Sequence, residues 1–350
     1  MDLSLKKFYK NKRVLITGHT GFKGSWLSIW LKYLQANVCG VSLKNSYKYA
    51  NYNLCGLEKK IKNYFFDLND YKYLLKIINN FKPDIIFHLA AQSLVLDGIK
   101  NPSYTFNNNI NTTINILEIL KNFQNISSTV IVTSDKVYEP SVKNMKEEHR
   151  LGGIDPYSAS KSCCEIVLNS YRNSFNSKSL RFLASARAGN VIGGGDVSEN
   201  RLVPDIYKAI QNKISLTIRN PNHIRPWQHV LDPLNGYLIL AMKNYKNGLF
   251  SSEWNFGPNL NRKKKVIDIA NDFKNINKNL KIKILKNFKK NESTVLNLNS
   301  NKAKKILNWK SQINHKEMIE LTNNEYFLKG CEESFYDQRI EHIKKYFHTK

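Results

Sequence analysis

A short strand, a glycine-rich turn and a helix follow one another within the first 35 residues of this chain. Residues 13–17 read as a β-rich run, and residues 21–35 have the apolar spacing of an amphipathic helix. Glycines between them let the backbone turn tightly and approach a pyrophosphate, whose charge the helix N-terminus attracts. A plain strand-to-helix turn is the alternative, but this context favours a dinucleotide site. The residues expected there are Gly18, Thr20, Gly21, Phe22, Lys23 and Gly24.

Strands and helices alternate through the first half of the chain, which predicts an α/β fold with a Rossmann-type doubly wound parallel sheet. We expect residues 1–190 to form the dinucleotide-binding domain with the catalytic residues. Residues 191–350 become irregular and polar, and we expect mainly a smaller C-terminal substrate-binding lobe, with some segments returning to the first domain. The expected strands are residues 37–43, 84–88, 128–133 and 180–186, and the further helices are residues 107–123 and 157–175.

Length and composition fit an ordinary soluble protein. The chain has 350 residues with 41% hydrophobic content, which is enough for a full core. Five cysteines without a CxxC motif argue against a disulfide framework and against a zinc site, so we expect no metal. The N-terminus lacks an apolar signal region and no run is long enough to span a membrane, so cytoplasmic residence is expected.

The formal net charge of +26 is compatible with a nucleic-acid surface, an anionic membrane surface or steering of an acidic substrate. Lysine and asparagine are enriched along the whole chain, as in residues 59–63, which indicates a coding bias. We therefore expect neither a nucleic-acid partner nor a membrane partner.

Two acid/base pairs follow the predicted strand 128–133 and begin the helix after it. Tyr157 and Lys161 are four residues apart and share one helical face, so the ammonium can help to keep the phenol partly ionised as a general base. Asp135 and Lys136 come directly after the strand, at the sheet edge where ligands bind. The first pair alone is typical of a dehydrogenase, whereas both together indicate a dehydratase. For Asp135 and Lys136 taken alone, a solvated loop is the simpler interpretation.

The cofactor's ribose is harder to assign. An acidic residue at the end of the second strand would bind the 2′-hydroxyl of NAD, but Ser42, Leu43 and Lys44 stand there. Lys44 would favour a 2′-phosphate, so NAD is expected and NADP stays open. Asp67 with Leu68 is a candidate adenine contact, and a helix-capping role is the alternative for the aspartate.

The motifs taken together resemble the CDP-glucose 4,6-dehydratases, which are extended short-chain dehydrogenases/reductases, over roughly residues 12–310. Lys136 matters most, because the related dTDP-glucose dehydratases carry a glutamate after the aspartate. The segments that carry the resemblance are residues 18–26, 88–93, 134–136, 157–161, 188–196 and 224–230.

The resemblance implies a role for each catalytic residue. Tyr157 would take the proton of the sugar 4-hydroxyl, with Ser134 hydrogen-bonded to the same group, while NAD accepts the C4 hydride. Lys136 would then remove the C5 proton as Asp135 protonates the departing 6-hydroxyl. Return of the hydride to C6 would give CDP-4-keto-6-deoxyglucose and water from CDP-glucose. An epimerase or dehydrogenase of the same family is the alternative, and a non-catalytic nucleic-acid-binding Rossmann protein is a third hypothesis.

The resemblance also implies the binding partners. CDP-glucose or a related nucleotide sugar is the expected substrate, and a homodimer built through the helices 107–123 and 157–175 is the expected assembly. Residues 97–102 and 137–140 and Val197 depart from the family pattern, so the nucleotide or the sugar is open to change. Ala90 is expected at the cofactor, and the residues expected at the substrate are Gln92, Ser93, Asn190, Arg201 and Arg225.

Overall fold

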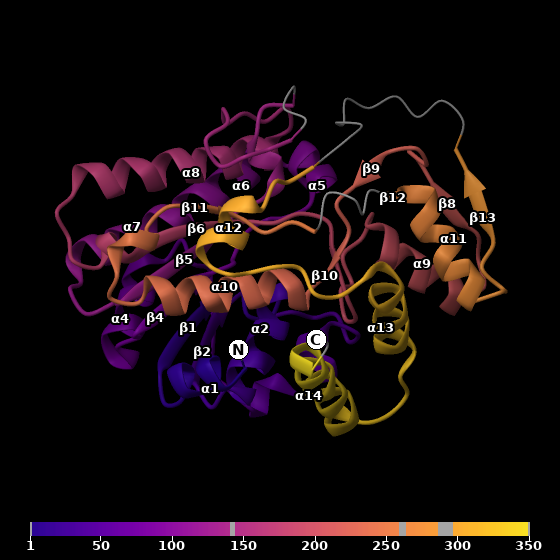
Figure 1. Ribbon diagram of the computed structural model, residues 1–350, viewed down its shortest axis with the longest axis horizontal. Helices are drawn as coiled ribbons and strands as arrows, with labels where there is room; N and C mark the ends of the chain where they lie inside the picture. The colour runs from indigo at the N-terminus through magenta and orange to yellow at the C-terminus, as the bar shows by residue number, and fades with distance from the viewer. Residues whose placement is uncertain (1, 141–143, 259–263, 286–296, 349–350) are drawn as a thin grey trace.

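A parallel sheet of seven strands forms the centre of the protein in a computed structural model that describes residues 2–140, 144–258, 264–285 and 297–348 (Figure 1). Every pairing in this sheet is parallel, which confirms the Rossmann-type fold. In spatial order the strands are β11 (Glu253–Asn255), β6 (Leu183–Arg187), β5 (Ser128–Val132), β4 (Ile85–His88), β1 (Arg13–Thr17), β2 (Asn37–Ser42) and β3 (Lys62–Phe65).

The strand order reverses beside β1. This strand pairs with β2 on one edge and with β4 on the other, so that Val14 lies opposite both Val38 and Ile85. The chain crosses to one side of β1 for β2 and β3, and to the other side for β4, β5 and β6. The crevice outside the carboxyl ends of the strands at such a reversal is where open α/β sheets bind their ligands.

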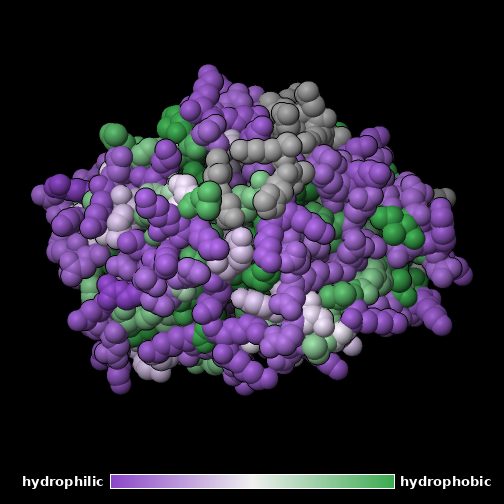
Figure 2. Space-filling view, turned by 60° about the horizontal axis from the view of Figure 1, so that its bottom comes forward, coloured by the Kyte–Doolittle hydropathy of each residue, from purple (hydrophilic) through white to green (hydrophobic). Residues whose placement is uncertain are grey.

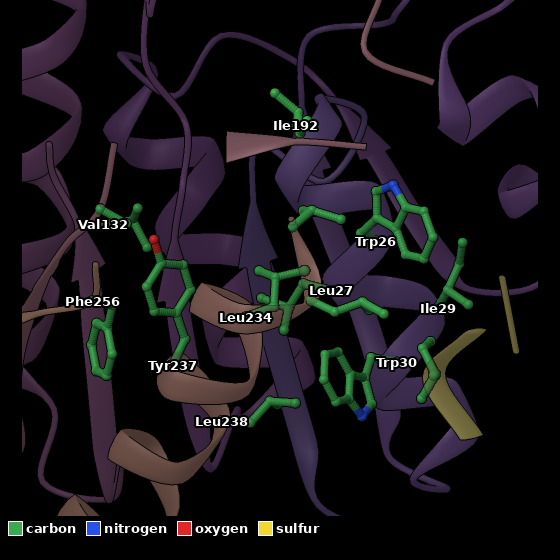
Figure 3. Packing of buried hydrophobic residues seen from close by; sticks show 14 of the residues in the cluster. Trp26, Leu27, Ile29, Trp30, Val132, Ile192, Leu234, Tyr237, Leu238 and Phe256 are labelled. Atoms are coloured by element: carbon green, nitrogen blue, oxygen red, sulfur yellow. The ribbon is translucent and has the colours of Figure 1, made fainter. Parts of the chain in front are cut away.

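Two layers of apolar side chains cover the two faces of the sheet. Successive strand residues point to opposite faces, so Val14 and Ile16 join one cluster and Leu15 joins the other. The first cluster includes the tryptophans Trp26 and Trp30 packed with residues of α10 (Figure 3). The helices of the first face are α1 (Asp2–Tyr9), α2 (Phe22–Tyr33), α10 (Leu231–Asn244) and α14 (Glu332–His348), and those of the second are α4 (Tyr71–Phe81), α7 (Thr112–Asn122) and α8 (Pro156–Ser174).

A smaller group of elements lies at one end of the molecule, beyond the carboxyl edge of the sheet (Figure 1). It contains pairs of very short strands, and β9 with β12 is the antiparallel pair among them. The division of the chain near residue 190 stays a prediction. These elements are β7 (Val191–Ile192), α9 (Leu202–Gln211), β8 (Leu216–Ile218), β9 (Ile224–Arg225), β10 (Gln228–His229), β12 (Lys264–Lys265), α11 (Val266–Ile276), β13 (Ile282–Ile284) and α13 (His315–Phe327). The remaining helices are α3 (Asn51–Leu54), α5 (Val95–Lys100), α6 (Pro102–Phe106) and α12 (Asn301–Ile306).

The predicted helix 107–123 is confirmed in part, because its first five residues form a wider π-helical turn, Asn107–Asn111. Asn109 lies in this turn and bonds to the loop after β4: it donates to the carbonyl of Gln92 and accepts from the amide of Gln92. It also donates to the hydroxyl of Ser160 on α8. The wider turn therefore ties two helices to the loop that borders the ligand crevice.

The outer face seen in Figure 2 is dominated by hydrophilic residues, with hydrophobic residues in small groups. Within the described ranges, no helix has both the length and the apolar character needed to cross a bilayer. All five cysteines are free thiols. Among the same described residues, no three His, Cys, Asp or Glu side chains are grouped to hold a metal ion.

Candidate active site

A cavity of about 800 Å³ opens at the carboxyl ends of β1, β4 and β5 and extends between the sheet and the smaller lobe. Every residue that the sequence predicts for the site lines this one cavity, although their roles stay predictions. They are Gly18, Thr20, Gly21, Phe22, Lys23, Gly24, Asp67, Leu68, Ala90, Gln92, Ser93, Ser134, Asp135, Lys136, Tyr157, Lys161, Asn190, Arg201 and Arg225.

The glycine-rich turn forms a bare backbone cradle at the start of α2. Gly18 has a φ of +73°, and a Cβ there would lie 2.7 Å from the amide nitrogen of Ala90. At Gly24 a Cβ would lie 2.1 Å from the carbonyl oxygen of Gly18. Side chains are therefore excluded from the cradle, and Gly21 is the N-cap of the helix that opens onto it. This cradle fits the pyrophosphate of a dinucleotide.

Asp67 lies at the far end of the same cavity, after β3. Its Oδ1 accepts hydrogen bonds from the backbone amide and the side-chain amide of Asn69. The residue that caps α4 is Asp70, which accepts from the amide of Tyr73 at 3.0 Å. The capping alternative for Asp67 is therefore wrong, and the carboxylate stands in the cavity wall.

Asp135 is held in place at the end of β5 but keeps one free oxygen. The residue is 2% exposed, and its Oδ1 accepts from the hydroxyl of Ser134 at 3.0 Å, whereas Oδ2 has no hydrogen-bond partner. A Cβ on Gly189 would lie 1.9 Å from that Oδ2, so only glycine fits beside the carboxyl. Lys136 follows, half-buried, with its amide donating to the Ser134 hydroxyl at 3.2 Å. A buried carboxyl with an unused oxygen is suited to proton transfer with a bound ligand.

Tyr157 and Lys161 begin α8, whose first turn is capped by Asp155 through the amide of Ser158. Lys161 is buried and donates to the carbonyl of Val132 at 3.2 Å, and burial lowers the pKa of its ammonium.

The ionisation of Tyr157 differs from the expectation. Burial raises the pKa of its phenol, against the lowering effects of a hydrogen bond with Ser134 and of the Arg201 charge. Burial thus opposes ionisation of this phenol, whereas the helical spacing predicts that Lys161 favours it. The sequence shows the helical spacing of the pair but not the burial that the lobe imposes on it.

Arg201 spans the cavity between its two sides. One guanidinium nitrogen lies 3.1 Å from the carboxylate of Asp196 in the lobe, and another donates to Ser93 after β4 at 3.2 Å. The hydroxyl of Tyr326, on α13, donates to the backbone carbonyl of Asp196 at 2.7 Å and so holds the backbone of that residue. An arginine held by one carboxylate beside open space is suited to receive a diphosphate.

Arg225 and Gln92 both make contacts within the protein. Arg225 is 5% exposed and lies 2.9 Å from Nδ1 of His223. The side chain of Gln92 is occupied in its own loop, since it donates to the carbonyl of Leu94 and accepts from the amide of the same residue. Asn190 has a φ of +48° and lines the cavity beside Gly189.

Sequence reasoning missed the contribution of the C-terminal helices. Tyr326 lines the cavity, and its neighbour Glu325 accepts from the amide of Gly194 at 2.6 Å and contacts His229 and His342. Burial raises the pKa of Glu325, but the charges and hydrogen bonds of these two histidines hold that pKa well below its usual range. No motif marks this segment, and its contact with Gly194 joins residues 131 positions apart.

The sheet, the backbone cradle and the Tyr157–Lys161 pair together define a protein of the short-chain dehydrogenase/reductase class. The chain belongs to the GDP-mannose 4,6 dehydratase family, whose model matches residues 15–322. It is 45% identical over 261 residues to the CDP-glucose 4,6-dehydratase of Salmonella typhimurium, across 72% of this chain and 73% of that protein. This likeness confirms the resemblance seen in the motifs.

More distant relatives include epimerases. The UDP-glucose 4-epimerase of Mycoplasma genitalium is 26% identical over 344 residues, across 93% of this chain and 97% of that one. Among solved structures, an epimerase from Methanothermobacter thermautotrophicus matches 99% of this chain and 98% of its own, with a TM-score of 0.81 and 24% identity. The dTDP-glucose 4,6-dehydratase of Bacillus anthracis in complex with NAD matches 97% of this chain and all of its own, with a TM-score of 0.74 and 17% identity. These two structures share the fold.

Proposed function

We propose that this protein is a sugar-nucleotide 4,6-dehydratase, a hydro-lyase that converts CDP-glucose into CDP-4-keto-6-deoxyglucose and water with NAD as its resident cofactor. One observation carries the proposal: Asp135 and Lys136 line the same cavity as Tyr157 and Lys161. A simple dehydrogenase or an epimerase needs the second pair but has no use for the first. The name of the Salmonella typhimurium relative supports both the reaction and the choice of CDP-glucose.

The residues present fit the cofactor. The bare backbone of Gly18, Gly21 and Gly24 would hold the pyrophosphate, and Asp67 with Leu68 would contact the adenine at the far end. Ala90 and Lys161 would border the nicotinamide end. When bound, NAD accepts the hydride of the sugar C4 and later returns it to C6.

Tyr157 is the proposed base for the first proton transfer. Its phenol would accept the 4-hydroxyl proton as C4 is oxidised, and Ser134, whose hydroxyl already bonds to Asp135, would orient the sugar. Burial raises the pKa of this phenol, and the hydrogen bond with Ser134 and the charge of Arg201 act in the opposite direction.

Asp135 and Lys136 perform the proposed elimination. The 4-keto group acidifies the C5 proton, which the Lys136 amine removes as the C5–C6 double bond forms. The C6–O bond breaks, and Asp135 gives a proton to the departing hydroxyl, which leaves as water. The unpartnered Oδ2 of the buried Asp135 carboxyl is the atom suited to this donation.

The smaller lobe would bind the nucleotide. Arg201 and Arg225 carry the guanidinium groups suited to the diphosphate, and Asn190, Gln92 and Ser93 border the sugar side. In this proposal residues 1–190 supply the cofactor site and the catalytic groups, and residues 191–350 mainly the substrate site. The five free thiols support a reducing compartment such as the cytoplasm.

The substrate screen that tests this function uses purified protein, CDP-glucose and parallel glucose and mannose nucleotides, with loss of water followed by mass spectrometry. We expect water loss from CDP-glucose and incorporation of solvent deuterium at C5 in D₂O. Lys136→Ala should abolish both, because it removes the base for C5, while the exposed Lys178→Ala should leave both unchanged. No water loss from any nucleotide by a folded, dinucleotide-bound protein would contradict the proposal.

We also propose a homodimer in which α7 and α8 pair with their copies as a four-helix bundle. Its support is the outer face of α8, where Ile166 is 58% exposed and Phe175, the C-cap residue, is 39% exposed. Light scattering should give twice the chain mass. Ile166→Glu should shift the protein to a monomer, because it places a charge in an apolar contact, whereas the exposed Ile276→Glu on α11 should not.

A further inference from the structure

Three consecutive glycines follow β7 in the lobe, and their backbone passes too close to the core for any side chain. A Cβ on Gly194 would lie 2.3 Å from Cβ of Glu325. Gly195 has a φ of +78°, and a Cβ there would lie 2.4 Å from Cβ of Asn51. Gly193 itself lines the cavity. The place of this glycine run is therefore set by the residues on which it rests.

Hydrogen bonds from three helices hold the glycine run. The amide of Gly194 donates to Oε2 of Glu325, on α13, at 2.6 Å. The carbonyl of the same glycine accepts from the indole of Trp26, on α2, at 3.0 Å. The carbonyl of Gly195 accepts from the amide of Asn51, at the start of α3, at 3.0 Å. The run is thus bonded to residues that lie far apart in the sequence.

Arg339, on α14, contacts all three of the residues that hold the run. Its Nε donates to Oδ1 of Asn51 at 3.0 Å, and another guanidinium nitrogen donates to the carbonyl of Glu325 at 3.2 Å. The guanidinium also lies 5.1 Å from the ring centre of Trp26. The residue is fully buried, and α14 packs against both α2 and α3. One arginine therefore joins the three helices behind the glycine run.

The glycine run leads directly into the proposed diphosphate site. Asp196 is the next residue, and its carboxylate lies 3.1 Å from a guanidinium nitrogen of Arg201. Both residues line the cavity. A shift of the glycine backbone would move Asp196, and the ion pair would carry the Arg201 guanidinium with it.

We propose that Arg339 is a positioning residue for the substrate. It keeps the three helices in register with the glycine run, and through that run it sets the place of Arg201. The inference rests on the proposed function, because it takes Arg201 as the residue that binds the diphosphate of the nucleotide. The helix α14 lies beyond residues 15–322, which the family model matches, so membership of the family does not assign this role.

Binding of CDP, which carries the diphosphate but cannot react, tests the proposal in the whole NAD-loaded protein. Arg339→Met keeps an apolar side chain beside Trp26 but removes the bonds to Asn51 and Glu325. We expect the affinity for CDP, measured by calorimetry, to fall about tenfold through the misplaced Arg201. The KM for CDP-glucose should rise by the same factor while kcat stays within about twofold, because the diphosphate is bound equally in the ground and transition states.

The variant Arg201→Ala shows whether the effect passes through that residue. In its background Arg339→Met should weaken CDP by less than about twofold, because two residues that act on one contact are not additive. Arg339→Lys keeps the charge with fewer donors, so its affinity should lie between those of Arg339→Met and the wild type. Tyr346→Phe, on the same helix, removes a buried bond to Asp232 and is the matched control. It should lower the midpoint of urea unfolding and leave both CDP affinity and KM unchanged.

A role in stability alone predicts a different result. A less stable Arg339→Met protein that bound CDP as the wild type does would overturn the inference. Equal losses for CDP and NADH, or full additivity with Arg201→Ala, would also overturn it. Should Arg339→Met fail to fold, Arg339→Lys provides the same comparison.

The proposed function fails in a distinguishable way. If the wild type bound CDP but removed water from no nucleotide sugar, the proposed reaction would be wrong and the inference about Arg339 would stand on the binding results. A folded, NAD-loaded wild type that bound no CDP would remove both.

Discussion

Lys23 is a cavity residue whose ammonium loses its charge at a pH slightly above neutrality. It lies in the first turn of α2 and lines the cavity. Burial, and after it the positive charge of Arg201, lower the pKa of its ammonium to about 8. The group is therefore charged below pH 8 and loses its charge as the pH rises through that value. A phosphate-bearing ligand beside it is bound more tightly by the charged form.

We predict that the affinity for NADH falls about threefold to tenfold as the pH rises from about 7 to about 9, because one charge-assisted contact is lost. Titrations at a series of pH values measure this. Lys23→Gln should bind more weakly at the lower pH and show little dependence, whereas Lys32→Gln, at the other end of the same helix, should follow the wild type. A wild-type affinity that does not change over this range would contradict the role of Lys23.

At the scale of elements, a buried ion pair joins α8 to the strands beneath it. Glu165, one helical turn after Lys161, accepts from two nitrogens of Arg187 on β6 at 2.9 and 3.0 Å and from the hydroxyls of Thr133 and Ser185. Burial raises the pKa of Glu165, but Arg187 and these hydroxyls lower it overall, so the carboxylate is ionised. The pair fixes the helix that carries the proposed Tyr157 base.

Glu165→Gln should therefore lower the free energy of unfolding by about 3 kcal/mol, because it leaves the Arg187 charge buried without its partner. Urea unfolding followed by circular dichroism measures the change. Glu341→Gln, which breaks the exposed pair with Lys344, should leave the midpoint of unfolding where it is in the wild type. Equal midpoints for the two variants would show that the Arg187 pair does not hold the helix.

The elements that sequence patterns predict are those set by local rules. β1 has the predicted bounds, residues 13–17, because burial on both faces of the sheet favours a continuous aliphatic run. The strand predicted at 180–186 begins instead as a turn, Leu180–Phe182, and becomes β6 only at Leu183. The pairs in the lobe contain two or three residues per strand and join segments far apart in sequence, as β7 with β10 does. No local pattern specifies such pairs.

At the scale of the whole molecule, the sequence predicts which residues line the cavity but not how they are held. Its motifs place Asp135, Lys136, Tyr157 and Lys161 in one cavity because parallel strands bring their carboxyl ends to one edge. The raised pKa of Tyr157 depends on burial by the lobe. The ion pair of Arg201 with Asp196 depends on α13, whose Tyr326 bonds to Asp196. Those contacts come from chain segments with no motif of their own.

The last strand of the sheet and the last wall of the cavity come from late in the chain. β11 pairs with β6 only once residue 255 is available, and the glycine run at 193–195 is held by Glu325. On a ribosome the chain emerges from its N-terminus, so the pyrophosphate cradle is present long before the substrate side can close. A nascent or prematurely terminated chain would therefore carry the pyrophosphate cradle without the substrate side, and ribosome stalling before β11 would leave the edge of β6 unpaired and exposed to other chains.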